Sequence, residues 1–439
     1  MGESVQLKIG MVDVDLLNNG TRHPNLAQMK ISAYCKRQGH IVNLIYDNEN
    51  LSQLSRYDFI IVSKVFNFTP VPFELMKLIE QNTSDLDTIE DKYCRINEPS
   101  IAEMLSYYSR VLKKRPETTK ILIGGTGFFE DGGRNLDQDI ELGMPDYDLY
   151  KEYVNEKILS GRDKSYYSDY VDCSIGFLTR GCFRKCSFCV NKKYDHAFVN
   201  TSDIYSFHKP GNKLIYLWDD NFLSIGRKKS LELLDKLIET NVPFQFRQGL
   251  DLRLMNDEVA EKFQHCKYHG DFIFAFDHIQ DKEIIIEKLN IWRKHCKKGT
   301  KLYVLCGYDA RSNDPKYGIN MDIPVEKKDL IDIENTFERI HILMKYGCLP
   351  YIMRYISYKE SPYHGIYTQL ARWCNQPSHF KKMSFEEFCV RNQDYVESDR
   401  PCASMRALNL LKKDAPEVYD KYATCKFMYA GKKTQEGID

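Results

Sequence analysis

Three cysteines within eight residues of a polar loop carry the clearest chemical signal in the sequence. Cys182, Cys186 and Cys189 are separated by three and then two residues. Thiolates at this spacing can converge on one metal centre. Because three protein ligands leave one coordination position open, a substrate or a further ligand can bind the metal directly. Gly181 and Lys185 are typical of an exposed loop, so buried thiols alone do not account for the pattern.

A closed zinc site is the alternative metal interpretation. Structural zinc sites normally take four Cys or His ligands, and no fourth one lies close by in the sequence, although His196 is within reach of the loop. The chain has fourteen cysteines, and in a reducing cytosol we expect most of the others to be small buried residues rather than disulfides. A second cluster stays open for four C-terminal cysteines, although their spacings of 15, 13 and 23 match no cluster motif: Cys374, Cys389, Cys402 and Cys425.

The loop follows the first strand of a series in which short apolar strands alternate with helices. The expected strands are 175–179, 214–218, 244–247, 272–276, 302–305 and 351–355. The expected helices between them include 228–239, 257–265, 282–295 and 330–345. Six such units form an open or closed barrel whose ligands bind at the carboxyl ends of the strands. We therefore expect the chemistry just after each strand.

The first 150 residues also alternate strand and helix, which predicts a parallel sheet with helices on both faces. The expected elements are strands at 8–14, 41–45, 59–62 and 120–123 and a helix at 24–37 that ends before Gly39. The turn Gly124-Gly125-Thr126-Gly127 lacks the dinucleotide-binding spacing, so a structural turn and a ligand-binding loop both stay open. Residues 131–148 are interpreted as the exit from this domain and residues 150–170 as a tether. Helices are expected near the C-terminus at 384–392 and 403–412.

The spacing of the three cysteines, with an aromatic residue just before the third, resembles the signature of the radical S-adenosylmethionine (radical SAM) superfamily. The resemblance implies that Cys182, Cys186 and Cys189 each bind one iron of a four-iron four-sulfur cluster, while S-adenosylmethionine chelates the fourth iron. It also implies that Phe188 packs beside the adenine. Such cofactors supply a 5′-deoxyadenosyl radical that abstracts hydrogen, and the protein directs it.

Residues after two later strands extend the resemblance. Asp219 and Asp220 belong to an Asp-Asp-Asn-Phe stretch that is similar to one in radical enzymes with an N-terminal cobalamin-binding domain, and they are candidates to bind the cofactor amino group or ribose. Two turn carboxylates in solvent are the alternative. Arg247 and Arg253 compete for the cofactor carboxylate, because an arginine fork matches carboxylate geometry, and surface ion pairing is the alternative for both.

The fourth and fifth strands differ in how closely they follow the family. Where the family often has Glu-Ser-Gly, this chain has Phe276-Asp277-His278, which leaves Asp277 and His278 as candidate pocket groups. Gly307 after the fifth strand stands where the family turns to let the cofactor approach. The methylthiotransferase branch is disfavoured, because its N-terminal domain supplies three further cluster cysteines and this one has Cys35 and Cys94.

The resemblance also implies a fold in three parts. Residues 1–150 resemble a Rossmann-like cobalamin-binding domain in their strand order and in two stretches, 24–29 and 39–42, but the Asp-X-His-X-X-Gly signature of a lower axial histidine is absent. Residues 151–360 are expected to form a partial (β/α)6 radical SAM barrel of the TIM type, and residues 361–439 a mainly helical region. Whether cobalamin binds is left open, with an unoccupied scaffold as the alternative.

Composition limits the partners and separates three functions. Lys plus Arg and Asp plus Glu both count 62, so no global positive field draws the chain to nucleic acid or membranes, and a small molecule or peptide is favoured over tRNA as substrate. No signal peptide or apolar span is found, which predicts a soluble cytoplasmic protein. The leading hypothesis is a radical SAM enzyme with an electron donor such as flavodoxin or ferredoxin. The alternatives are a cobalamin-dependent radical SAM methyltransferase and a non-catalytic metal module that binds RNA or protein.

Overall fold

The computed structural model divides the chain into two compact units, each described by itself. The first comprises Met1–Gly181 and Cys189–Trp218, and the second Cys182–Phe188 and Asp219–Asp439. The structure describes residues 4–47, 51–82, 100–129, 133, 135–189, 191, 193–319, 322–395 and 400–427. Cys94 and the start of the expected exit segment at 131–132 therefore lie outside the described residues. The boundaries expected near residues 150 and 360 stay predictions.

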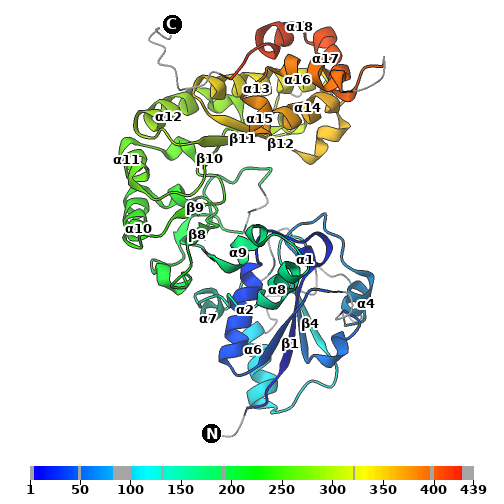
Figure 1. Ribbon diagram of the computed structural model, residues 1–439, viewed down its shortest axis with the longest axis vertical. Helices are drawn as coiled ribbons and strands as arrows, with labels where there is room; N and C mark the ends of the chain where they lie inside the picture. Colours follow the sequence, from blue (N-terminus) through cyan, green and yellow to red (C-terminus); the bar gives the residue numbers. More distant parts are fainter. Residues whose placement is uncertain are drawn as a thin grey trace. The chain divides into compact units, whose positions relative to one another are not determined.

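A four-stranded parallel sheet forms the centre of the first unit (Figure 1). Its strands are β1 (Lys8–Asp13), β2 (Ile41–Ile45), β3 (Phe59–Ser63) and β4 (Lys120–Gly124), in the order β2-β1-β3-β4. All four agree closely with the predicted strands. Each strand is a nearly continuous apolar run, because helices cover both faces of the parallel sheet and the side chains on both faces are therefore buried.

Helices cover both faces of this sheet, as predicted. They are α2 (Leu26–Arg37), α4 (Phe73–Asn82), α6 (Ile101–Ser106) and α8 (Lys151–Leu159). Ile9 and Met11 of β1 belong to one core with α2, α6 and α8, whereas Val12 and Ile60 belong to a second core with α4. Figure 1 shows α2 and α4 on opposite faces of the sheet. Alternating side chains on each strand produce the two cores.

Residues 135–170, predicted as an exit and a tether, are in fact part of the first unit's interior. They form α7 (Gln138–Glu141), α8, the short helix η3 (Lys164–Tyr167) and α9 (Ser168–Val171). Tyr150, Tyr153, Tyr167 and Tyr170 are buried in the core. The Tyr150 hydroxyl donates to the Asp13 carboxylate over 2.9 Å. The prediction was wrong because the tyrosines are spread among charged residues, which made the segment look polar. In the structure their rings fill the core and their hydroxyls form hydrogen bonds.

Two pairs of short strands complete the first unit. β5 (Cys173–Gly176) pairs in parallel with β8 (Leu214–Leu217), and β6 (Thr179–Arg180) pairs antiparallel with β7 (Phe198–Val199). The prediction of one strand over 175–179 merged β5 with the start of β6. The short β6 leads directly into the cysteine loop.

In the second unit, β10 (Phe272–Ala275), β11 (Thr300–Cys306) and β12 (Leu349–Arg354) form a parallel sheet in that order. The other elements before β12 are β9 (Phe244–Phe246), α10 (Arg227–Glu239), α11 (Asp257–His265), α12 (Lys282–His295) and α13 (Val325–Lys345). The helices follow the predicted ranges, and α13 begins five residues earlier. Trp292 of α12 packs on Phe272 and Phe274 at ring distances of 4.7 and 5.0 Å, which seats this helix on the sheet. The α/β class with parallel sheets is confirmed, and the six-unit barrel stays a prediction.

After β12 the described residues form helices. They are α14 (His364–Cys374), α15 (Pro377–Phe380), α16 (Phe385–Asp394), α17 (Ala403–Asp414) and α18 (Pro416–Val418). Ser384 and Glu387 form a capping box at the start of α16. Within the described part of the chain, no helix has the length and apolar character needed to cross a membrane.

The glycine turn after β4 packs on the backbone that follows β3. The Lys64 amide donates to Gly124 and the Gly127 amide donates to Lys64, over 3.1 and 2.9 Å. Gly125 has φ +99°, and a Cβ there would lie 2.3 Å from the Lys64 carbonyl oxygen. Of the two interpretations left open, these contacts favour the structural turn, because close backbone packing alone requires glycine.

Replacing Gly125 tests this packing. Gly125→Ala is expected to lower the free energy of unfolding by about 2 kcal/mol or more, because the new Cβ adds a backbone clash to a strained left-handed φ. Gly124→Ala is the matched control, because nothing lies within 4 Å of its Cβ position. Chemical denaturation of the full-length protein measures both. Equal losses in the two variants would contradict the packing role.

Candidate functional site

The sulfurs of the three-cysteine loop accept hydrogen bonds. Cys182, Cys186 and Cys189 are reduced and half-buried. The Cys182 Sγ atom accepts from the Arg184 amide at 3.4 Å and from Asn221 Nδ2 at 3.3 Å. Cys189 Sγ accepts from the Asn191 amide at 3.4 Å. Donors directed at sulfur stabilise thiolates, which are the form that binds metal.

A charged clamp holds the loop in the second unit through Arg184. The Arg184 guanidinium binds the Asp251 carboxylate at 2.7 Å. Asp251 also binds Arg253, which in turn binds Asp281, each at 2.7 Å. Although burial alone would raise it, Arg253 and Arg184 hold the pKa of Asp251 below its usual value. The carboxylate therefore stays charged and keeps the loop in place.

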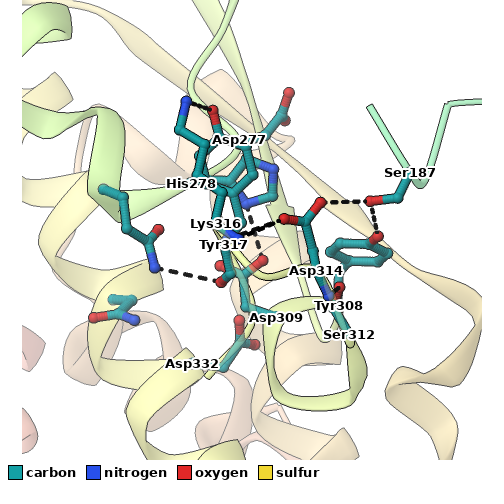
Figure 2. Close-up of polar contacts among 12 residues, drawn as sticks. Ser187, Asp277, His278, Tyr308, Asp309, Ser312, Asp314, Lys316, Tyr317 and Asp332 are labelled. Atoms are coloured by element: carbon teal, nitrogen blue, oxygen red, sulfur yellow. Dashed lines mark hydrogen bonds and ion pairs between the residues drawn. The ribbon is translucent and has the colours of Figure 1, made fainter. Parts of the chain in front are cut away.

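A second clamp acts through Ser187. Its hydroxyl donates to Asp314 at 2.9 Å and accepts from the Tyr308 hydroxyl, as Figure 2 shows. The next residue, Phe188, packs against the rings of His278 and Tyr308, with centroids 5.6 and 5.3 Å away. Phe188 is thus fixed beside the carboxyl ends of β10 and β11.

At the end of β10, His278 is fixed by a carboxylate and a ring. Its Nδ1 lies 2.9 Å from an Asp309 carboxylate oxygen, and its ring stacks on Tyr317 with centroids 3.9 Å apart (Figure 2). Burial raises the pKa of the neighbouring Asp277, and the charges of His278 and Arg339 oppose this rise. The residues that depart from the family pattern thus form a polar group beside the cysteine loop.

One face of α13 holds the ends of β10 and β11 with buried polar side chains. Asp329, Asp332, Thr336 and Arg339 follow one another at spacings of three, four and three residues, and each is at most 1% exposed. Arg339 donates to the carbonyl oxygens of Phe276 and Asp277. No motif or strand-end position in the sequence had selected the four residues of this stripe. Its signal was the helical spacing of polar residues on an otherwise apolar face.

Asp332 of this stripe fixes the glycine after β11. Its carboxylate accepts from the Gly307 amide at 2.8 Å and from the Tyr367 hydroxyl at 2.6 Å. Gly307 has φ +72°, and a Cβ there would lie 2.6 Å from the Tyr358 Cβ. Glycine is therefore required at this turn by backbone conformation and by the approach of Tyr358.

The other predicted site residues are placed less centrally. Asp219 is buried and Asp220 half-buried directly after β8, and both belong to the second unit. Arg247 is half-buried after β9 and donates to the Gln245 side chain at 3.3 Å. Arg253 is bound to two carboxylates, as described above, which supports the ion-pair alternative for it. Asn221, which no sequence argument selected, contacts a cysteine sulfur instead.

Among the described residues, no three His, Cys, Asp or Glu side chains form a group placed around a single metal ion. Ligands of a four-iron cluster each bind a different iron, so they are arranged differently from those of a mononuclear site. The four C-terminal cysteines of the proposed second cluster are each reduced. Cys374 and Cys389 are fully buried in α14 and α16, where burial raises their thiol pKa values.

The sequence matches no protein-family model and no curated protein. The chain is similar to solved radical SAM enzymes. It matches the methyltransferase TsrM from Kitasatospora setae, with cobalamin and a [4Fe-4S] cluster bound, at 11% identity over 80% of this chain and 75% of that one, with a TM-score of 0.45. It matches the cobalamin-dependent radical enzyme OxsB, with aqua-cobalamin and S-adenosylmethionine bound, at 14% identity over 97% of this chain and 65% of that one, with a TM-score of 0.48.

A further TsrM structure holds a tryptophan substrate and an S-adenosylmethionine analogue, at 11% identity and a TM-score of 0.46.

The buried Asp332 predicts a pH dependence of stability. Burial, together with the negative charge of Asp309, raises its pKa from 3.8 to about 6. Between these values the folded protein keeps a proton that the unfolded chain has released, so the contribution of Asp332 to stability is highest below pH 4, falls as pH rises to about 6, and is level above. Asp332→Asn removes this titration. The wild-type free energy of unfolding should therefore fall relative to the variant by on the order of 3 kcal/mol between pH 4 and pH 7. Urea unfolding over this pH range measures it, and a constant difference would contradict it.

Proposed function

We propose that the chain is a radical SAM iron–sulfur enzyme. Cys182, Cys186 and Cys189 would hold a four-iron four-sulfur cluster, which would also bind S-adenosylmethionine. The observation that carries the proposal is the set of three reduced, half-buried cysteines whose loop is clamped by Arg184 and Ser187. The donor set fits the cluster, because the sulfurs of Cys182 and Cys189 already accept hydrogen bonds as thiolates do.

The protein's own residues would then position the reactants. When bound, the cluster and S-adenosylmethionine supply a 5′-deoxyadenosyl radical for hydrogen abstraction. Phe188 offers its ring to the adenine while His278 and Tyr308 support it from behind. Asp219, Asp220 and Asp277 offer carboxylates to the cofactor's amino and hydroxyl groups, and Arg247 offers a guanidinium to its carboxylate. Gly307 leaves room for the backbone to approach.

Methyl transfer with cobalamin is the second candidate, and one feature of the first unit favours it. Val65, Phe66 and Phe68 follow β3 at the carboxyl edge of the parallel sheet and are 45, 46 and 75% exposed. This edge is where such sheets bind ligands, and large exposed apolar side chains there suit the broad face of a corrin ring. Both named neighbours bind cobalamin as well. The main proposal does not depend on it.

The substrate is proposed to be a small molecule or a peptide, because the balanced charge gives no general attraction for tRNA. An external one-electron donor such as flavodoxin or ferredoxin reduces the cluster. A non-catalytic metal module that binds RNA or protein is the remaining alternative, and it predicts zinc in place of iron.

Anaerobic reconstitution with iron and sulfide tests the main proposal. The wild type should bind about four irons and, with dithionite and S-adenosylmethionine, release 5′-deoxyadenosine. Single Cys→Ala changes at 182, 186 and 189 should each abolish the release and lower the iron content. Cys266→Ala is the matched control, because it removes a half-buried thiol that belongs neither to the loop nor to the candidate second cluster, and it should keep both properties. A fully loaded wild type that releases no 5′-deoxyadenosine would refute the proposal.

Corrinoid binding tests the second candidate. Wild-type protein incubated with hydroxocobalamin should retain about one equivalent through gel filtration, measured by its visible absorbance. Phe68→Asp should weaken this binding at least tenfold, because it places a charge on the apolar edge. Leu159→Asp is the control, since Leu159 is 87% exposed on α8. Retention of no corrinoid by the wild type would leave the radical SAM proposal standing without cobalamin.

A further inference from the structure

Asn221 is the one side chain that the described residues place in hydrogen-bonding contact with the Cys182 sulfur. Its Nδ2 atom lies 3.3 Å from Cys182 Sγ, and both residues belong to the second unit. Asn221 is 5% exposed and directly precedes the short helix η5 (Phe222–Ile225). Its carbonyl oxygen accepts from the amide and the hydroxyl of Ser224, at 3.0 and 2.8 Å. These bonds fix the backbone from which the side chain extends.

The orientation of the Asn221 amide is explained by the sulfur. A thiolate only accepts hydrogen bonds, so the nitrogen of the amide has to face it. Reversing the amide would place the partly negative Oδ1 against a negative sulfur. In the orientation present, Oδ1 is buried and has no hydrogen-bond partner among the described residues. An unpaired buried acceptor is unfavourable, so the bond to Cys182 has to compensate for it.

We propose that Asn221 is a positioning residue that sets the reduction potential of the cluster held by Cys182. This inference rests on the proposed function, because it requires that a cluster is bound. A donor directed at a cysteine sulfur withdraws electron density from the iron and stabilises the reduced, more negative state. The Arg184 amide gives the same sulfur a second bond, and that bond belongs to the loop backbone. Of the two hydrogen bonds to the Cys182 sulfur, the one from Asn221 comes from a side chain and can therefore be removed by a substitution.

The consequence is a cluster that is easier to reduce than its loop alone would make it. The donor is buried, so its bond to the sulfur is not weakened by competition from solvent in the folded protein. Asn221 also follows the two candidate cofactor-binding residues Asp219 and Asp220 in the chain. The Asp-Asp-Asn-Phe stretch thus combines cofactor-binding candidates with a group that acts on the cluster through Cys182.

An EPR-monitored redox titration of the reconstituted full-length protein tests this inference. At a fixed applied potential near the midpoint, Asn221→Ala should lower the ratio of reduced to oxidised cluster about tenfold, equal to a shift of about 59 mV for one electron. Asn221→Asp should lower it further, because an isosteric carboxylate removes the donor and adds a negative charge. This second variant keeps the side-chain volume if the alanine variant fails to fold.

Asn256→Ala is the matched control. Asn256 also hydrogen-bonds through its side chain in the second unit, but it caps α11 by accepting from the Val259 amide. Its loss should lower thermal stability and leave the reduction potential unchanged. In wild-type protein labelled with ¹⁵N only at the asparagine side-chain amide, pulsed EPR of the reduced cluster should show a nitrogen coupling that Asn221→Asp removes.

The outcomes separate the two proposals. Variants that load iron fully but titrate like the wild type would overturn the role of Asn221 and leave the radical SAM function intact. A potential that shifts equally in Asn256→Ala would also overturn it, because the shift would then follow general destabilisation. A wild type that takes up no iron–sulfur cluster would overturn both.

Discussion

The buried polar face of α13 is the constraint on which the candidate site depends. Polar groups can be buried only if they find partners, and Asp332 and Arg339 find theirs in the backbone at the ends of β10 and β11. The strand ends cannot shift without leaving a charge unpaired in the core. Asp309 extends this arrangement, because it lies beside Asp332 and orients His278.

The cysteine loop is held by groups that these strand ends carry. Ser187 reaches Tyr308 and Asp314, which follow β11, and Phe188 rests on His278, which follows β10. The proposed role of these cysteines as cluster ligands requires such outer contacts, because a short polar segment has no core of its own. The α13 helix thus fixes the strand ends, and the strand ends hold the loop that contains Cys182 and Cys186 through hydrogen bonds and ring contacts. Fixing the loop in advance reduces the conformational cost of binding a cluster.

The first unit is stabilised mainly by apolar packing instead of buried polar contacts. Its sheet is fixed by apolar side chains on both faces, and its glycine turn serves backbone packing on Lys64. The carboxyl edge of the sheet combines buried carboxylates with exposed aromatic rings. Burial, reinforced by the charge of Asp15, raises the pKa of Asp13 to about 7.

The strands and most helices could be predicted from the sequence, because they depend on local periodicity. The three-cysteine loop could be recognised from the spacing of its cysteines. Residues 150–170 were wrongly predicted to be a tether, because their tyrosines become buried only when α8 packs on the sheet. The sequence selected Arg253, which proved to be bound to Asp251 and Asp281. Only the tertiary structure decided the role of Asn221 and of the α13 stripe. Asn221 and Cys182 are 39 positions apart in the chain, so no local sequence pattern predicts the hydrogen bond between them. Only folding brings the two atoms to 3.3 Å.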